Sequence, residues 1–186
     1  MTHEICIAGF GGQGVLSLGQ MIAYSAMIDE YEVSWMPSYG PEMRGGTAHC
    51  TVIVSDKKIS SPIVSTFDVV IALNQPSIDK FEDKVKPNGF LFYEKSAIIN
   101  LPTRSDIKIF SISALEAANE IGAKQIQNVI FLGALLSLNK IVKHESVIET
   151  LKKIIPPHRA NLLELNFKAL SRGGELVQEF NLISGG

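Results

Sequence analysis

Ile5-Cys6-Ile7-Ala8-Gly9-Phe10-Gly11-Gly12-Gln13-Gly14 decides the fold, because an apolar run passes directly into a segment with four glycines in six positions. The amphipathic stretch that begins at Val15 predicts a helix directly after it. A glycine loop between a strand and a helix exposes backbone N–H groups, which can hold an anionic group or admit another backbone. The sequence therefore predicts an α/β unit with a working surface at this loop.

A second glycine-rich segment, Tyr39-Gly40-Pro41-Glu42-Met43-Arg44-Gly45-Gly46, follows the next predicted strand, residues 32–36. In a parallel α/β sheet the loops after the first two strands leave from the same edge, so we expect the two segments to lie together. Glu42 and Arg44 add opposite charges and Tyr39 adds an aromatic plane, a mixture typical of a contact surface. A local Glu–Arg pair that braces a bend is the alternative.

Strand and helix signals alternate along the rest of the chain. We expect strands at residues 4–8, 32–36, 47–55, 68–73, 90–93 and 107–111, and a return strand at 58–61 that forms a hairpin with 47–55. We expect helices at residues 15–29, 76–81, 114–121, 128–138, 146–154 and 159–171, with a capping box of Ser113 and Glu116 at the third. This pattern predicts one domain over residues 1–186: a three-layer α/β/α sandwich with a largely parallel, mixed sheet and a helical C-terminal third.

Composition argues against several classes of function. The net charge is −2 and basic residues form no run, so nothing indicates a nucleic-acid partner. The longest uncharged apolar helix candidate, residues 128–139, is far shorter than the roughly 20 residues that span a bilayer, and residues 1–4 do not resemble the start of a signal peptide. Cys6 and Cys50 lack metal-ligand or cluster spacing, so we expect buried, reduced thiols, no metal site and a cytoplasmic protein with no membrane partner.

Gly9, Gly11 and Gly14 match the dinucleotide-binding spacing G-x-G-x-x-G. That site also needs an acidic residue at the end of the second strand, whereas Glu32 stands at its start, so NAD binding is disfavoured. Gln13 is a further departure, because its large amide at the helix start could bind a ligand or a neighbouring chain. The alternative is that these glycines only permit a tight turn.

Three motifs in order carry a family resemblance: residues 9–14, residues 39–47 and Ile59-Ser60-Ser61-Pro62. Together they resemble the gamma subunit of 2-oxoacid:ferredoxin oxidoreductases and the gamma domain of single-chain pyruvate:ferredoxin oxidoreductases. The resemblance continues through residues 68–77 and 87–89. It therefore covers nearly the whole chain, and most firmly its first half.

The resemblance implies a subunit that is not catalytic alone, in an enzyme that converts a 2-oxoacid, coenzyme A and oxidised ferredoxin into acyl-CoA, CO2 and reduced ferredoxin. Thiamine diphosphate would lie between the alpha and beta subunits, and iron–sulfur clusters on other chains such as a ferredoxin-like delta subunit. The sequence looks most like members that use 2-oxoglutarate or a branched-chain 2-oxoacid. The implied contact residues toward coenzyme A or a partner are Gly9, Gly11, Gly12, Gln13, Gly14, Tyr39, Glu42, Arg44, Gly45 and Gly46.

Two other functions stay open. One is an independent nucleotide-binding oxidoreductase, which the glycine spacing favours. The other is a purely structural scaffold subunit, which the apolar C-terminal third favours. The apolar side chains of Phe131, Leu132, Leu135, Leu136 and Leu138 could dock a partner or fill the domain's own core.

Overall fold

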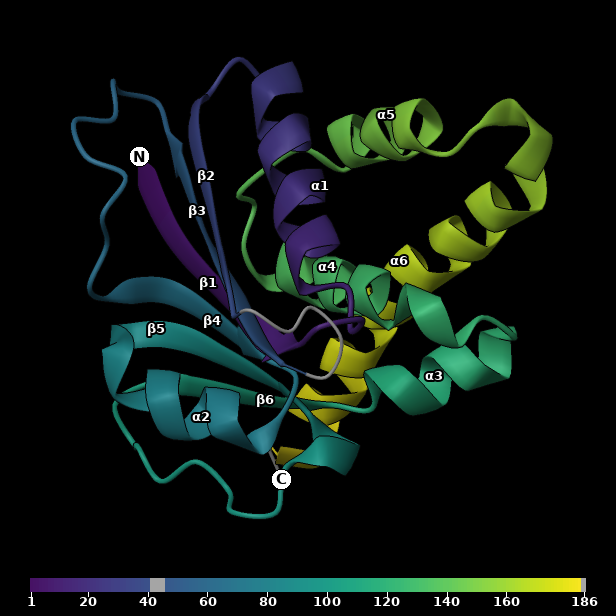
Figure 1. The fold of residues 1–186 in the computed structure, drawn as a ribbon. Helices are drawn as coiled ribbons and strands as arrows, with labels where there is room; N and C mark the ends of the chain where they lie inside the picture. Colours follow the sequence, from purple (N-terminus) through teal and green to yellow (C-terminus); the bar gives the residue numbers. More distant parts are fainter. Residues whose placement is uncertain (41–45, 185–186) are drawn as a thin grey trace.

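The computed structural model describes residues 1–40 and 46–184. Within these ranges six strands form one mixed sheet (Figure 1). The strands are β1 (Thr2–Phe10), β2 (Glu32–Tyr39), β3 (Thr47–Ser55), β4 (Phe67–Ala72), β5 (Val85–Glu94) and β6 (Lys108–Ile112). Their order is β2-β3-β1-β4-β5-β6, with β3 antiparallel to both neighbours and the other pairs parallel. The predicted mixed, largely parallel sheet is confirmed.

Helices cover both faces of the sheet. They are α1 (Val15–Ile28), α2 (Gln75–Phe81), α3 (Ala114–Ile121), α4 (Gln127–Leu138), α5 (His144–Ile154) and α6 (Ala160–Ser184). Helices α1 and α3 to α6 pack on one face, and α2 packs on the other (Figure 1). The predicted α/β/α layering is therefore confirmed, with a thin layer on the α2 face. In the described ranges no helix has both the length and the apolar character that crossing a bilayer demands.

Strand β1 occupies the centre of the sheet and is apolar on both faces. Ile5 and Ile7 belong to the core under α1, whereas Cys6 and Ala8 belong to the core under α2. Alternation along a strand directs successive side chains to opposite faces, and burial of both faces is typical of a parallel strand between helices. The carboxyl end of β1, where the glycine loop begins, is thus held by packing from two sides.

Helix α4 is buried on nearly every side. Phe131, Leu132 and Leu135 have no exposed surface, and Leu136 and Leu138 pack against the same core. These residues therefore fill the chain's own core. Of the two alternatives that the sequence left open, the core position is confirmed and the docking face is not. A helix that is apolar all round is typical of a core position.

Helix α6 extends to Ser184 and so runs well past the predicted end at residue 171. The pair Gly173-Gly174 favours a helix end, because glycine is a poor helix former. Gly173 is instead the point where α6 crosses α4, and a Cβ placed there would lie 2.7 Å from the backbone nitrogen of Ala134. The close crossing explains a glycine inside the helix.

The predicted return strand at residues 58–61 does not form. Strand β3 pairs with β2 on one side and β1 on the other, so both of its edges are already used. The chain leaves β3 at Ser55, beside Thr2 at the start of β1. As part of the working surface we expect Ser60, Ser61 and Pro62 to form an edge turn on the same face as the glycine loop. The structure places them at the opposite edge of the sheet, so that expectation is wrong.

At two places the local structure differs from what the sequence pattern favours. Ser113 precedes α3, but its side chain makes no capping hydrogen bond. The buried carboxylate of Glu94, at the end of β5, accepts the Leu115 N–H at 3.0 Å instead. Pro87-Asn88-Gly89 is typical of a turn before a strand, yet these residues lie within β5, where the register with β4 shifts and Asn88 has a φ of 64°.

His49 gives the stability of the fold a pH dependence. Burial, followed by the nearby charges of Lys80 and Lys84, lowers the pKa of His49 below its ordinary value of 6.5, and the ring packs 5.2 Å from that of Phe81. As the pH falls through 6.5, the unfolded chain therefore binds more protons than the folded chain. The free energy of unfolding consequently decreases as the pH falls.

We expect the free energy of urea unfolding to fall more steeply in the wild type than in His49→Gln between about pH 7.5 and about pH 5.5. His3 adds to the same trend, because burial also lowers its pKa. If the free energy of unfolding changed equally with pH in the two proteins, His49 would be hydrated in the folded chain and its pKa would not be lowered by burial.

Candidate functional site

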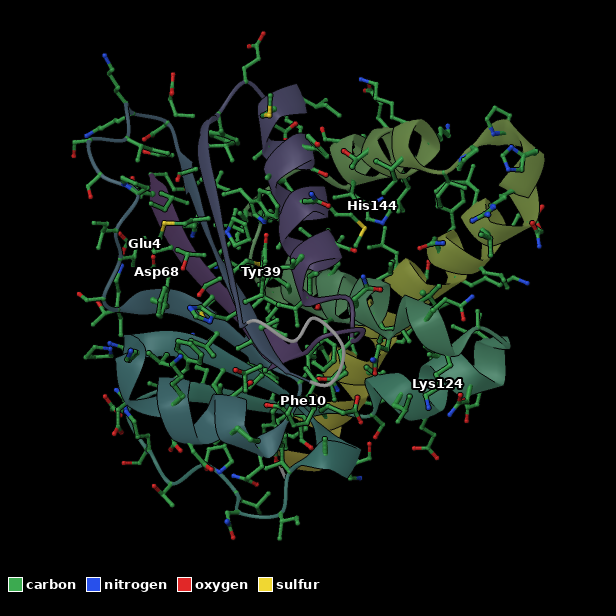
Figure 2. All side chains as sticks on the ribbon, in the orientation of Figure 1. Glu4, Phe10, Tyr39, Asp68, Lys124 and His144 are labelled. Atoms are coloured by element: carbon green, nitrogen blue, oxygen red, sulfur yellow. The ribbon has the colours of Figure 1, made fainter. Side chains whose placement is uncertain are left out.

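The two glycine-rich segments meet at one edge of the sheet. The N–H of Gly11 donates to the carbonyl oxygen of Gly46 at 2.8 Å, which joins the segments directly. Strands β1 and β2 are both antiparallel to β3, so they are parallel to one another and their loops leave from one edge. The expected proximity of the loops is confirmed, and Figure 2 labels Phe10 and Tyr39 beside this edge. The remaining predicted contact residues, Glu42, Arg44 and Gly45, lie outside the described residues.

The first loop needs glycine at two positions. A turn closes where the Gln13 N–H donates to the Phe10 carbonyl at 3.1 Å, and Gly12 in that turn has a φ of 96°. Gly14 has a φ of 80° and precedes α1, so no side chain caps this helix. Left-handed backbone is costly for residues with a Cβ. The glycines therefore set the turn and leave the first N–H groups of α1 without a side-chain cap.

Gln13 ties the loop to the neighbouring strand. Its Oε1 accepts the Phe10 N–H at 2.6 Å, and its Nε2 donates to the Leu73 carbonyl at 3.1 Å. Leu73 directly follows β4, so the amide bridges the carboxyl ends of β1 and β4. These two strands flank the point where the chain order reverses, which is where open α/β sheets hold their ligands. Gln13 thus lies at the switch point of the sheet and links its two central strands there.

Asn128 fixes the other side of the loop. Its Nδ2 donates to the Gly14 carbonyl at 3.4 Å, and the same oxygen accepts the Leu18 N–H at 2.9 Å. A Cβ on Gly14 would lie 2.7 Å from that nitrogen. No sequence motif singles out Asn128, because a contact between residues so far apart in the chain leaves no local pattern.

A hollow of about 240 Å³ opens beside the loop. It is lined by Phe10, Gly11, Gly12, Gly14, Val15, Leu16, Ser17, Tyr39 and Ala48. Pockets that hold drug-sized molecules usually measure roughly 300–1,000 Å³, so this hollow suits a smaller group. A phosphate, a carboxylate or one side chain of a partner matches its size and its position at the start of α1.

The cysteines do not suit an iron–sulfur cluster. Cys6 faces the core under α2 and Cys50 the core under α1, so the two thiols lie on opposite faces of the sheet. Burial raises the pKa of Cys50 to about 12, and burial also raises the pKa of Cys6. Cluster ligands are thiolates that converge on one site. Across residues 1–40 and 46–184, no group of three or more His, Cys, Asp or Glu side chains is placed to hold a metal ion.

Comparison with known proteins identifies the family. Residues 4–176 match the family described as "Pyruvate ferredoxin/flavodoxin oxidoreductase". The ketoisovalerate oxidoreductase subunit VorA of Methanothermobacter thermautotrophicus is 36% identical over 176 residues, which are 95% of this chain and 36% of that protein. The chain therefore spans about a third of the length of this relative. The 2-oxoglutarate synthase subunit KorC of Methanocaldococcus jannaschii is 32% identical over 182 residues, 96% of each chain.

Solved structures agree with the sequence relatives. A keto/oxoacid ferredoxin oxidoreductase gamma subunit from Geobacter sulfurreducens superposes with a TM-score of 0.81 at 29% identity, covering 95% of this chain and 99% of that one. A 2-oxoglutarate:ferredoxin oxidoreductase from Magnetococcus marinus, solved with 2-oxoglutarate, coenzyme A and succinyl-CoA, gives a TM-score of 0.88 at 26% identity, covering 96% of this chain and 31% of that one. The resemblance drawn from the glycine motifs is confirmed: this chain belongs to the pyruvate ferredoxin/flavodoxin oxidoreductase family.

Proposed function

We propose that this chain is the gamma subunit of a cytoplasmic 2-oxoacid:ferredoxin oxidoreductase. The complex would oxidise a 2-oxoacid, release CO2, transfer the acyl group to coenzyme A and pass the electrons to ferredoxin. Family membership supports this function, as does the likeness to a gamma subunit that the chain covers almost completely. The relatives are named for ketoisovalerate, 2-oxoglutarate and pyruvate. We propose 2-oxoglutarate or a branched-chain 2-oxoacid, the members that the sequence motifs resemble most.

The junction of the two glycine segments carries this proposal. The hydrogen bond from Gly11 to Gly46 builds a backbone surface at one sheet edge, suited to binding and positioning. Both of the chain's thiols are buried, and the Cys50 Sγ donates to the carbonyl of Val15 at 3.5 Å. We therefore assign electron transfer to clusters on other subunits, such as a ferredoxin-like delta subunit. Thiamine diphosphate would lie between the alpha and beta subunits and supply the carbanion chemistry there.

The glycine edge would face coenzyme A or a partner subunit. Gly9, Gly11, Gly12, Gln13, Gly14, Tyr39 and Gly46 lie along this edge. The uncapped N–H groups at the start of α1 favour a phosphate of coenzyme A or a carboxylate of a neighbour, by roughly 1 kcal/mol if exposed. In this proposal the chain contributes binding, and Gln13 holds the loop in the conformation that binds.

A negative charge in the turn tests this role. Gly12→Asp adds a carboxylate beside the start of α1, at a left-handed position that aspartate tolerates better than most residues. We expect the KM for coenzyme A of the assembled enzyme to rise about tenfold, the effect of roughly 1.4 kcal/mol of repulsion. Gly122→Asp is the matched control, because Gly122 has a similar φ of 89° at the end of α3, and a Cβ placed there would meet no atom within 4 Å. Equal KM values in the two variants would count against a phosphate at this edge.

The competing proposal is an independent nucleotide-binding oxidoreductase, and the sheet order disfavours it. In the dinucleotide-binding fold the second strand lies beside the first, whereas here β3 separates β2 from β1. Glu32, the one acidic residue within β2, begins that strand at the opposite edge. Titration of the isolated chain with NADH or flavin distinguishes the two: tight binding would favour the nucleotide enzyme.

Native mass is the first measurement for the proposed function. The chain would be tagged in its own cells and isolated anaerobically, and the mass and cofactor content of the particle would be determined. We expect a much larger complex that contains thiamine diphosphate and iron–sulfur clusters and oxidises a 2-oxoacid with coenzyme A and ferredoxin. Recovery of the chain alone, or as a simple homo-oligomer, would contradict the proposal.

A further inference from the structure

A loop on the α2 face presents two large aliphatic side chains to solvent. It spans residues 98–106, between the short helical turn Lys95–Ala97 and β6, and runs beside α2 (Figure 1). Ile99 is 89% exposed and Leu101 is 64% exposed. Ile98, the first residue of the loop, and Ile107, directly after it, are buried in the core under α2, so both ends of the loop are anchored.

Gln75 at the start of α2 clamps the tip of this loop. Its Oε1 accepts the N–H groups of Ile99 and Asn100, each at 2.9 Å. Its Nε2 donates to the Asn100 carbonyl at 3.2 Å and to the Asp79 carboxylate at 2.8 Å. Three of the four hydrogen bonds of this side chain therefore fix the loop backbone at Ile99 and Asn100, and the fourth ties the amide to α2.

Glu82 clamps the loop a second time, close to Leu101. Its Oε1 accepts the Thr103 N–H at 2.7 Å and the Arg104 N–H at 3.0 Å. The Arg104 guanidinium donates in turn to the carbonyls of Glu82 and Val85. The loop is held at two points from the α2 side, so it loses its conformational entropy when the chain folds. A partner that binds the loop therefore does not have to order it.

From this geometry we infer that Ile99 and Leu101 insert into an apolar pocket on another subunit of the oxidoreductase. The inference rests on the proposed function. Rigid, exposed aliphatic side chains on a loop are suited to recognition, because a partner gains their burial without having to order them.

The occupant is a different subunit and not a second copy of this chain. Two side chains bury only a small part of the roughly 800 Å² per partner that a stable dimer needs, so on their own they do not hold two copies of this chain together. In a multi-subunit complex, other contacts supply the remaining area. In the ketoisovalerate relative the matched region is 36% of a longer chain, so other protein is joined to the same module there.

Titration of the purified chain into an alpha–beta subassembly tests the inference. The double variant Ile99→Ser/Leu101→Ser is expected to bind at least tenfold more weakly than the wild type, with an unchanged melting temperature because both side chains are exposed. Ile63→Ser is the matched control, since Ile63 is 79% exposed on the loop between β3 and β4, and its affinity is expected to match the wild type. Gln75→Ala keeps both aliphatic side chains but frees the loop tip, so it is also expected to weaken binding.

The outcomes separate this inference from the proposed function. If the wild type does not bind the alpha–beta subassembly, both fail. If the wild type binds and the double variant binds equally well, only the docking loop is wrong. An equal loss of affinity in Ile63→Ser would overturn the specific role of Ile99 and Leu101. Sedimentation that shows a wild-type dimer and a monomeric double variant, with unchanged alpha–beta binding, would assign the loop to a second copy instead.

Discussion

Replacing Gly173 with alanine is expected to lower the free energy of unfolding by about 3 kcal/mol, the upper range for an overpacked core site. Gly173 lies where α6 crosses α4, and an added Cβ would stand 2.7 Å from the Ala134 nitrogen and 2.9 Å from the Ile130 carbonyl carbon. Both neighbours are backbone atoms of a buried helix, so no side-chain rotation relieves the clash. The helices must separate, and the core between them loses its close packing.

Gly174 offers a matched control at the next position of the same helix. A Cβ there meets only ordinary contacts, with the Ser137 Cβ at 3.7 Å as its nearest neighbour. Gly174→Ala is therefore expected to stabilise the protein by about 0.5–1 kcal/mol, because alanine favours the helix. Urea unfolding of both variants measures the difference. Equal effects would show that intrinsic helix preference, and not the crossing, explains the glycine pair.

The first strand, the glycine turn and the first helix could be predicted from the sequence, because the patterns that indicate them are local. The apolar run before Gly9, the glycine turn and the periodic stretch after Gly14 each act over a few residues, and α1 begins at Val15 as predicted. Strand β3 and helix α3 have the predicted bounds for the same reason. The shared edge of the two glycine loops followed from topology, because strands of one direction release their loops at one edge.

The end of α6 and the pairing of β3 could not be predicted, because distant packing decides them. Gly173-Gly174 taken alone favours a helix end, and only the crossing with α4 shows why the helix continues. The β-branched residues of β3 indicate a strand without indicating its partners. Its insertion between β1 and β2 moved residues 58–61 to the opposite edge.

The contacts that fix the glycine loop were beyond local patterns as well. Gln13 is unusual for its amide at a helix start, but the Leu73 carbonyl that it binds lies 60 residues away. Asn128 is 114 residues from its partner Gly14 and belongs to a largely apolar helix. A sequence pattern can show that a polar side chain is unusual at a site, whereas the fold decides which group it contacts.

Removing the carboxylate of Glu94 is expected to cost about 2–3 kcal/mol of stability, through lost hydrogen bonds to a buried charged group. Glu94 is 2% exposed at the end of β5. Its Oε2 accepts the Leu115 N–H in the first turn of α3, and its Oε1 accepts the N–H and the hydroxyl of Ser96, at 3.1 and 2.8 Å. Glu94→Ala leaves the Leu115 donor without its acceptor and removes a negative charge from a helix N-terminus.

Two further variants show which residue caps α3. Ser113→Ala is expected to change stability by less than about 0.5 kcal/mol, because the Ser113 side chain makes no capping bond. Glu94→Gln can still accept from Ser96 but presents an NH2 group to the Leu115 N–H, so an intermediate loss of about 1 kcal/mol is expected. Denaturant unfolding of the three variants gives the order. If Ser113→Ala cost as much as Glu94→Ala, the local capping box would cap the helix in solution; the expected order instead assigns the cap to a carboxylate from the sheet, 21 residues earlier in the chain.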